Sequence, residues 1–364
     1  MTVLAAVCRE NGKPLQIEEV ELEEPRADEI RVRMVASGIC HTDLSMIDTP
    51  DRVPLPIVLG HEGAGVVEEV GGAVMDLEPG DHVVLSYGFC GLCSSCAQGT
   101  PYHCDRMHLL NFGGSRWDGS SPISQKEEPI HGMFFVQSSF ATHAIAPARS
   151  AVKVPKDIPL ELLGPLGCGI QTGAGTVINI FQAPVGSSMA IFGSGSVGLS
   201  AVMAAKVAGC KEIIAVDLFE HRLQLAREFG ATHGINPERE NVVDRIRDIT
   251  GSGVDFAFDN TGVGEVIQEA FTCLKKRGQC AIAAGFGVDL KLSAFEILLG
   301  KKIQGVTEGE SVPRVFIPQM IELYRQGRFP FDRLMTYYDF KDINKAIEAS
   351  KSGEVVKPVL RFNK

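Results

Sequence analysis

A glycine-rich turn near the middle of the chain limits the possible folds more than any other feature. Gly193, Gly195 and Gly198 form GSGSVG directly after the apolar stretch MAIF and directly before the helical pattern VGLSAVMAAKVAG. In such a turn the first glycine permits the sharp reversal and the second lets a phosphate approach the backbone. The third lets the helix pack closely on the strand. This context predicts a βαβ unit that binds a dinucleotide at a helix N-terminus.

An acidic residue at the end of the next apolar stretch strengthens this prediction. Asp217 closes EIIAVD, where its carboxylate can accept hydrogen bonds from the adenosine ribose hydroxyls and would repel a 2′-phosphate. The alternative is a structural glycine turn followed by an unrelated strand-end aspartate. The order strand, motif, helix, strand and acid favours the functional interpretation, and it predicts NAD rather than NADP.

The residue pattern divides the chain into two domains, as its length of 364 residues also suggests. Residues 1–169 consist of short β-branched stretches broken by Gly and Pro, which predicts a mostly β domain. Residues 170–306 alternate six strand candidates with helical segments that end at glycine, which predicts a doubly wound, parallel six-stranded sheet. The tail, 307–364, has two amphipathic helices and a last apolar stretch. The Gly/Ser-rich segment 111–125 is expected to be a surface loop.

Charge and composition exclude several classes of partner. The formal net charge is −10 and the sequence pI is about 5.5, opposite to the basic surface that nucleic acid or an anionic membrane requires. No apolar stretch approaches the roughly 18 residues of a membrane helix, and the N-terminal segment soon becomes acidic. We therefore expect a soluble cytoplasmic protein with no nucleic-acid or membrane partner.

Four of the ten cysteines lie close together in the first half of the chain. Cys90, Cys93, Cys96 and Cys104 form C-x2-C-x2-C-x7-C. Four thiolates at this spacing can close a tetrahedral shell around Zn²⁺ with no open position, which is typical of a structural site. An iron–sulfur cluster and two disulfides are the alternatives, and nothing in the sequence indicates the oxidising compartment that disulfides need.

Three further candidate metal ligands stand apart from this lobe, each beside glycine. They are Cys40 in GICHTD, His61 in GHEGAG and Cys168 in LGCGIQTG. Taken singly, a buried cysteine is commonly a small apolar core residue, and a histidine in a glycine-rich turn often satisfies local backbone. None of the three indicates a metal site by itself.

Together, these segments, GSGSVG and the four-cysteine lobe resemble the zinc-containing medium-chain alcohol dehydrogenases over essentially the whole chain. The resemblance implies an α/β protein with a GroES-like catalytic domain, to which 307–364 return, and a Rossmann NAD-binding domain. It implies two zinc ions per chain, one in the four-cysteine lobe and one catalytic. The catalytic ion would be bound by Cys40, His61 and Cys168, the Cys₂His set that leaves a fourth position for substrate oxygen. The implied reaction is NAD-dependent interconversion of a primary alcohol and its aldehyde.

The resemblance also assigns roles to neighbouring residues. Thr42 would take the alcohol proton, Asp43 would orient His61, and Glu62 would assist ligand exchange at the metal. A capping threonine and two solvated carboxylates are the alternatives. The relay histidine that several family members have three residues after Thr42 is Ser45 here. The remaining residues expected to contact the cofactor are His41 and Lys357 near the pyrophosphate, together with Thr172, Ser196, Val197 and Arg222.

Within the family, the sequence looks most like bacterial aryl-alcohol (benzyl alcohol) dehydrogenases, with geraniol-type enzymes also close. Both groups oxidise a benzylic or allylic primary alcohol, for which an apolar pocket is suitable. The candidate wall residues are Tyr87, Trp117, Phe134 and Phe135. The alternatives are a glutathione-dependent formaldehyde dehydrogenase, a polyol dehydrogenase and a non-catalytic NAD-binding relative, although the last would be expected to lack a catalytic ligand. Resemblance to bacterial members suggests a homo-oligomer, with a tetramer favoured over a dimer.

Overall fold

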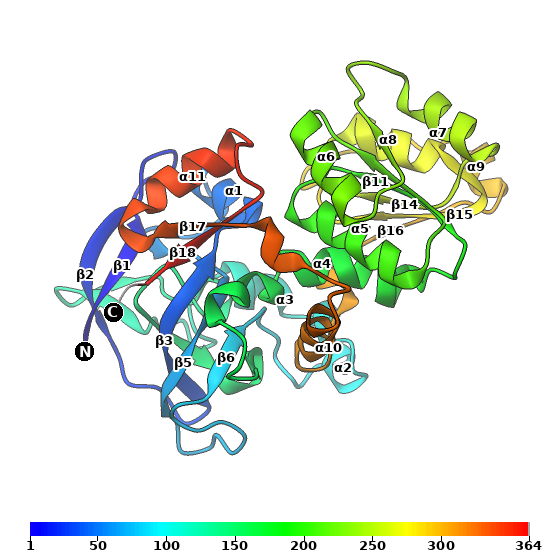
Figure 1. Cartoon of the computed structure of the whole chain (residues 1–364). Helices are drawn as coiled ribbons and strands as arrows, with labels where there is room; N and C mark the ends of the chain where they lie inside the picture. The colour runs from blue at the N-terminus through cyan, green and yellow to red at the C-terminus, as the bar shows by residue number, and fades with distance from the viewer. Residues whose placement is uncertain (363–364) are drawn as a thin grey trace. The chain divides into compact units, whose positions relative to one another are not determined.

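The structure of the chain is a computed structural model that describes residues 1–362 (Figure 1). It divides into two compact units. The first comprises Met1–Cys168, Val312–Pro318 and Asp332–Lys364, and the second comprises Gly169–Ser311 and Gln319–Phe331. These limits differ from the expected 169/170 and 306/307. In addition, the tail does not return as a whole, because Gln319–Phe331 belongs to the second unit. Helix α10, Pro313–Arg325, therefore has residues in both.

The second unit contains the predicted parallel sheet, with the strand order β13-β12-β11-β14-β15-β16. All five pairings in it are parallel. The order equals 3-2-1-4-5-6 in chain order, so the direction of winding reverses between β11 and β14, where sheets of this type bind ligands. The strands are β11 Ser188–Phe192, β12 Glu212–Val216, β13 His233–Ile235, β14 Val254–Asp259, β15 Leu274–Ile282 and β16 Lys302–Gly305. This confirms the predicted fold class.

Helices connect these strands, and several end where the sequence places a glycine. Helices α5, Ser196–Ala208, and α7, Val242–Thr250, both end at a glycine in the left-handed region, Gly209 and Gly251. Such residues close helices without a Cβ penalty. The other helices of this unit are α4 Gly169–Gly175, α6 Glu220–Phe229, α8 Gly264–Thr272 and α9 Ala294–Leu298. Figure 1 shows them around the sheet.

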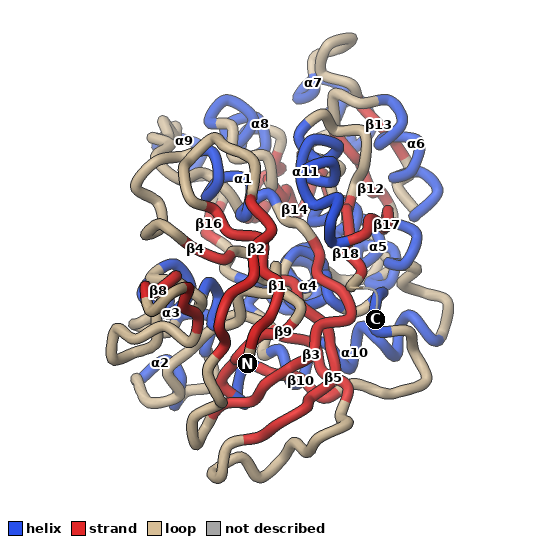
Figure 2. The backbone as a smooth tube through the Cα atoms, turned by 90° about the vertical axis from the view of Figure 1, so that its left-hand side faces the viewer, coloured by secondary structure: helices blue, strands red, loops and turns tan. Residues whose placement is uncertain are grey.

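The first unit is built on two sheets, whose strands are drawn in red in Figure 2. A five-stranded sheet has the order β4-β1-β2-β7-β8, and a seven-stranded sheet has the order β10-β6-β5-β3-β18-β17 with β9 also paired to β3. The first contains β1 Thr2–Cys8, β2 Gln16–Leu22, β4 Ile57–Val58, β7 Ile123–Gln125 and β8 Glu128–Ile130. The second contains β3 Glu29–Gly38, β5 Glu62–Val70, β6 His82–Leu85, β9 His143–Pro147, β10 Ala151–Lys153, β17 Met335–Asp339 and β18 Lys357–Arg361. The tail thus inserts β18 beside β3.

Short helices connect and cover these sheets. They are α1 His41–Asp48, α2 Ser94–Ala97, α3 Met107–Phe112 and α11 Ile343–Lys351. The apolar face of α11, with Ile343, Ala346 and Ile347, packs into the core of the five-stranded sheet.

The segment 111–125 is more than the surface loop that its composition suggests. Asn111 is buried in α3, and the segment ends in strand β7. Its Arg116 is only 7% exposed and forms a two-point ion pair with Glu29, at 2.7 and 3.0 Å. The Gly/Ser content of the segment did not predict a buried arginine, because composition does not show which charged side chains form ion pairs.

Within the described residues 1–362, no helix is both long and apolar enough to span a membrane.

Candidate metal centres and dinucleotide-binding turn

Four potential ligand atoms meet in the interior of the first unit. One atom each from Cys40, His61, Glu62 and Cys168 lies within 4.8 Å of the others, and all four residues are buried. Cys40 is the N-cap of α1, and Cys168 follows a 3-10 turn, Gly164–Gly167. His61 directly precedes β5, and Glu62 is the first residue of that strand. The fold therefore brings together the three ligands that the resemblance implies, from three separate segments.

Asp43, the third residue of α1, holds two of these segments in place. Its carboxylate accepts hydrogen bonds from the backbone N–H of Cys40, at 3.0 Å, and of Gly60, at 3.1 Å. It also lies 2.9 Å from Nδ1 of His61. Asp43 and His61 are both fully buried, so this contact fixes the imidazole and directs its other nitrogen away from Asp43.

The donor set fits a metal ion on two observations. Nε2 of His61 is buried and has no hydrogen-bond partner, which is costly unless something else binds it. The cluster also favours positive charge. A hydrogen bond from Cys168 lowers the pKa of Cys40 well below its usual value, even though burial raises it. Burial lowers the pKa of His61, but Asp43 and Cys40 together raise it well above normal. A cation bound by two thiolates and this imidazole satisfies all of these groups.

Glu62 lies beside these ligands and is paired with a buried lysine. Nζ of Lys357 is 2.9 Å from both carboxylate oxygens and donates to the carbonyl of Ile39 at 3.2 Å. Burial raises the pKa of Glu62. Burial by itself would lower the pKa of Lys357, but the neighbouring carboxylate of Glu62 raises it above its usual value. Gly38 makes room for the pair, since a Cβ there would lie 2.1 Å from Oε2 of Glu62.

The contacts of Lys357 bear on its expected place near the coenzyme pyrophosphate, which stays a prediction. The resemblance suggested a residue near the coenzyme pyrophosphate, but Lys357 is 1% exposed and its ammonium group is engaged by Glu62 and Ile39. A buried, paired ammonium cannot also bind a phosphate without breaking this pair. Sequence position alone could not show this, because the contact joins residues 62 and 357 across two strands.

Aromatic rings line one side of His61. Phe135 stacks on the imidazole with centroids 4.5 Å apart, and Phe134 meets it edge-on at 5.6 Å. Phe112, which the sequence analysis did not single out, contacts both phenylalanines and is only half-buried. Phe135 and Val136 have φ angles of +47° and +52°, a conformation that non-glycine residues rarely adopt.

The other predicted residues near this cluster divide into two groups. Tyr87 belongs to the buried core that also contains Phe134 and Phe135. Trp117 is 52% exposed and stacks with Arg106, and these contacts give its expected role as a wall residue no support. Thr42 is half-buried, and its Oγ1 is 3.8 Å from Sγ of Cys40.

Two residues near Thr42 bear on the expected proton relay. Ser45 is half-buried, and His41 is exposed at the first turn of α1.

The sequence did not indicate a role for Gln137. Its side-chain oxygen accepts a hydrogen bond from the N–H of Gly63, and its side-chain nitrogen donates to the carbonyl of His61.

The four-cysteine lobe is a compact cluster of thiols whose ligand atoms also lie within 4.8 Å of one another. The Sγ atoms of Cys90 and Cys96, and those of Cys93 and Cys104, are 3.9 Å apart. Zinc–sulfur bonds of about 2.3 Å place the corners of a tetrahedron about 3.8 Å apart, so the separation fits one zinc ion. It is far too long for a disulfide, and all four cysteines are free.

Backbone amides further suit this lobe to thiolates. The N–H groups of Leu92 and Cys93 point to Sγ of Cys90, at 3.4 and 3.3 Å, and that of Arg106 points to Sγ of Cys104 at 3.4 Å. Backbone hydrogen bonds from Cys96 and Asp105 lower the pKa of Cys93 to about 6. Donors aimed at sulfur stabilise the anionic form that binds zinc.

The glycine turn of the second unit has the geometry that its sequence predicts. Gly193 has φ +90°, and a Cβ on Gly198 would lie 1.8 Å from the carbonyl oxygen of Gly193. A Cβ on Gly195 would meet nothing within 4 Å, so the space in front of this glycine is open. The carboxylate of Asp217 accepts hydrogen bonds from the N–H of Ser194, at 2.6 Å, and of Phe219, at 2.9 Å.

The remaining predicted cofactor residues lie in the second unit. Ser196 and Val197 form the first turn of α5, whose N-cap is Gly195. Thr172 lies on α4, which packs closely on α5, since a Cβ on Gly173 would lie 2.0 Å from the carbonyl of Val197. Arg222 stands near the start of α6, with its guanidinium over the ring of Phe219 at 4.8 Å.

Two family models match the chain. The model of the alcohol dehydrogenase GroES-like domain matches residues 26–156, and that of the zinc-binding dehydrogenases matches residues 196–326. Together they span more than half of the chain, on both sides of the division between the units.

Relatives and solved structures match over nearly the full length of the chain. A geraniol dehydrogenase of Castellaniella defragrans is 46% identical, over 98% of this chain and 97% of that protein. The crystal structure of an alcohol dehydrogenase zinc-binding domain protein from Burkholderia ambifaria matches at 52% identity, with a TM-score of 0.98 and complete coverage of both chains. That of benzyl alcohol dehydrogenase from Acinetobacter calcoaceticus matches at 44% identity and a TM-score of 0.96, again with complete coverage.

Proposed function

We infer that this chain, which belongs to the zinc-binding alcohol dehydrogenase family, uses NAD to interconvert a primary benzylic or allylic alcohol and its aldehyde. One observation carries the catalytic part of the proposal. The imidazole of His61 is held by Asp43 with its Nε2 buried and unpartnered, within 4.8 Å of donor atoms from Cys40 and Cys168. Three protein ligands of these types leave a fourth position open, as catalysis requires.

Zinc bound by these three residues would supply Lewis acidity to the oxygen of the alcohol or aldehyde. The chain would supply the rest of the catalytic machinery. Asp43 keeps the ring of His61 in one tautomer, and the Thr42 hydroxyl, next to Cys40, takes the alcohol proton. Lys357 holds Glu62 beside the ligands. Ser45 is a candidate for the next relay position, and an unchanged pH dependence of turnover in Ser45→Ala would eliminate it.

The cofactor proposal rests on the glycine turn. NAD would supply hydride acceptance, and the open space at Gly195 before the N-terminus of α5 suits a pyrophosphate. Asp217 already accepts two backbone N–H groups, which fixes the orientation of its carboxylate. A fixed negative charge there favours a free ribose hydroxyl over a 2′-phosphate. Turnover with NAD at least about 10-fold more efficient than with NADP is the expected result.

The substrate proposal rests on the aromatic side of the metal cluster. Phe112, Phe134 and Phe135 form one contacting group beside His61, and a flat apolar substrate suits such a wall. The strained φ angle of Phe135 is consistent with a functional constraint on that ring. The relatives named for geraniol and benzyl alcohol act on an allylic and a benzylic primary alcohol, respectively.

The test is a spectrophotometric assay of NADH formation with benzyl alcohol, cinnamyl alcohol, geraniol, ethanol, sorbitol and S-hydroxymethylglutathione, with zinc determined in the same sample. We expect the first three to give the highest kcat/KM and zinc content to be about two per chain. Equal or better kcat/KM for ethanol would refute the substrate class. Preference for the glutathione adduct or sorbitol would support one of the alternative activities. Activity in metal-free protein would overturn the mechanism.

Self-association is a further part of this proposal. Large apolar side chains are exposed around α9 in the second unit, including Phe295 at 67% and Leu298 at 83%. Exposed apolar surface of this kind is typical of protein–protein interfaces. We propose a homo-oligomer, with a tetramer favoured and a dimer possible, and light scattering of the purified protein would decide between them.

A further inference from the structure

A cavity of about 500 Å³ in the first unit lies beside the four-cysteine lobe and has no assigned role. It opens to solvent and is lined by the start of β3, the segment after β6, helix α3, the loop at 115–118 and the end of β9. Its volume is within the range of small-molecule pockets, roughly 300–1,000 Å³. Cys90 is one of its lining residues, so the cavity borders the lobe but is distinct from the Cys40–His61–Cys168 cluster.

One of the arginines that line this cavity forms no ion pair with an acidic side chain among the described residues. The lining contains four arginines and three acidic residues. Arg26 pairs with Asp118, and Arg149 pairs with Asp28. Arg116 pairs with Glu29 and also with Glu23, which lies outside the lining. In the part of the chain that the structure describes, Arg106 forms no ion pair. Arg106 is therefore the arginine of this lining whose guanidinium has no carboxylate partner among the described residues, and it can bind a monoanion.

Arg106 is held in a definite orientation. Its guanidinium carbon lies 3.3 Å from the centroid of the Trp117 ring, and its backbone N–H donates to Sγ of Cys104. A guanidinium stacked on an indole keeps its N–H groups at the edge of the plane, where they can bind a carboxylate in two-point fashion. The arginine is thereby preorganised for a planar anion.

The other walls are mostly apolar. Phe89, Leu110, Met133 and Val136 contribute to the lining, and all except Phe89 are buried. Ser150, 2% exposed, also lines the cavity, and its hydroxyl has no hydrogen-bond partner in the described part of the chain. Apolar walls with one unpaired cation at the rim favour an amphipathic ligand over inorganic phosphate.

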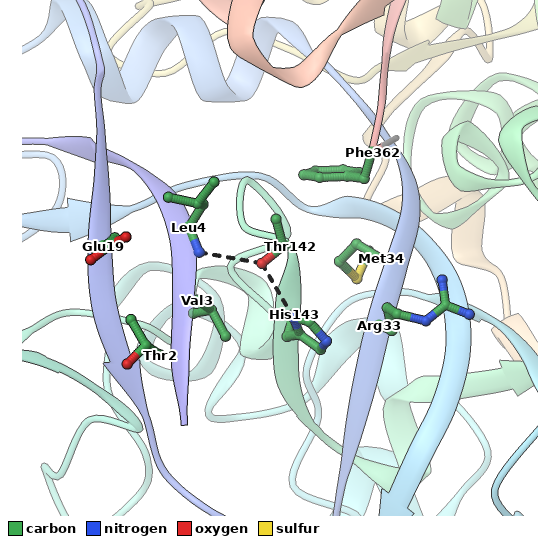
Figure 3. A pocket seen from close by; sticks show the side chains of 9 residues that line it. All are labelled: Thr2, Val3, Leu4, Glu19, Arg33, Met34, Thr142, His143 and Phe362. Atoms are coloured by element: carbon green, nitrogen blue, oxygen red, sulfur yellow. Dashed lines mark hydrogen bonds between the residues drawn. The ribbon is translucent and has the colours of Figure 1, made fainter. Parts of the chain in front are cut away.

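A second cavity in the same unit, of about 600 Å³, shows the contrast (Figure 3). The polar side chains of that cavity already form hydrogen bonds or ion pairs with protein groups. Thr142 accepts from the N–H of Leu4 and contacts His143, while His143 and Arg33 both pair with Glu68. That cavity has no comparable unpaired cation and carries no proposal.

We propose that the cavity between Arg106, Trp117 and the four-cysteine lobe binds an organic monocarboxylate with a flat or extended apolar body. The carboxylate binds the guanidinium of Arg106, and the apolar body lies against Leu110, Met133 and Val136. The site is independent of which alcohol the enzyme oxidises.

The chain provides its own probe, because Trp117 is its only tryptophan. The zinc-loaded protein is titrated with 3-phenylpropanoate under tryptophan-selective excitation, and with 3-phenylpropanamide as the neutral isostere. We expect a saturable change in emission with the acid, and binding at least about 10-fold weaker for the amide. Calorimetry of the same titration gives the affinity without using the fluorophore.

Arg106→Gln and Arg106→Lys test the contact directly, with Arg239→Gln in the second unit as the matched loss of one exposed arginine. We expect Arg106→Gln to weaken binding of the acid at least about 10-fold, Arg106→Lys less, and Arg239→Gln not at all. Alcohol turnover should be unchanged in all three, which shows that they fold. No saturable signal in the wild type, equal affinity for the amide, or unchanged affinity in Arg106→Gln would each overturn the proposal.

Discussion

The two cysteine-containing clusters of the first unit differ in almost every physical respect. The lobe draws its ligands from one short stretch, residues 90–104, and has two half-buried thiols and backbone N–H donors aimed at sulfur. The other cluster draws Cys40, His61 and Cys168 from three distant segments, all buried, with two carboxylates and a lysine around them.

This difference separates a closed site from an open one. Four thiols at tetrahedral spacing complete a zinc shell, which leaves no open position for a substrate. Two thiols and one imidazole do not complete it, and the side chains around them can position or exchange a ligand. The lobe should therefore matter for stability and the buried cluster for turnover, and the following changes test that division.

Replacing His61 should have the largest effect on activity. His61→Gln removes the unpartnered nitrogen, and we expect kcat/KM to fall by about 10³-fold or more, because Lewis-acid stabilisation is worth several kcal/mol. Zinc content should fall from about two per chain to about one, with the lobe still loaded. His131→Gln is the control, as His131 also has a buried unpartnered Nδ1 but lies outside the cluster. Full zinc content with full activity would show that His61 is not a ligand.

Opening the lobe should reverse this pattern. Cys96→Ser leaves three thiols, and we expect a loss of unfolding free energy of at least about 3 kcal/mol, because structural zinc contributes directly to folding. Differential scanning calorimetry with zinc analysis measures it. At a temperature where the variant is folded, its kcat should stay within about 3-fold of the wild type. A loss of kcat as large as in His61→Gln would mean that the two clusters do not divide their roles in this way.

Changing the residue that supports His61 should give an intermediate effect. Asp43→Asn preserves size but removes the charge opposite Nδ1, and we expect a loss of about 10–100-fold in activity or in metal affinity at the buried cluster only. Competition with a chromogenic chelator resolves the two zinc sites. Equal weakening of both sites would instead indicate a general loss of structure.

The smallest expected effect concerns the space around Glu62. In Gly38→Ala the new Cβ would lie 2.1 Å from Oε2 of Glu62, so the Glu62–Lys357 pair must move. We expect a destabilisation of about 1–3 kcal/mol and a several-fold fall in kcat/KM. Gly72→Ala is the matched control, because a Cβ there meets nothing within 4 Å. Equal melting temperatures and activities in the two variants would show that the Glu62–Lys357 pair does not need the space left by Gly38.

The sequence predicted the features that depend on local order. The six strands, the glycine turn and the acid at Asp217 lie in one continuous stretch, and the four cysteines of the lobe lie in another, so spacing alone was informative. The buried cluster could not be derived in this way, since nothing local connects Cys40, His61 and Cys168. Only the resemblance joined them.

The contacts that the sequence did not predict have the same cause. Lys357 was assigned from the resemblance and Trp117 from its residue type, but their partners, Glu62 and Arg106, are set by tertiary packing. Arg116 lies in a segment whose composition predicted a solvent-exposed loop, whereas both Arg116 and its ion-pair partner Glu29 are buried.

The three contacts of Asp43 have a consequence for how the protein acquires its metal. Because one carboxylate ties the Cys40 amide, the Gly60 amide and the His61 ring together, the imidazole takes its orientation from the polypeptide and not from an ion. The chain can then reach its folded form with this pocket empty and be loaded afterwards. Such a protein lends itself to substitution by cobalt, whose visible absorption would make the environment of the reacting oxygen directly observable.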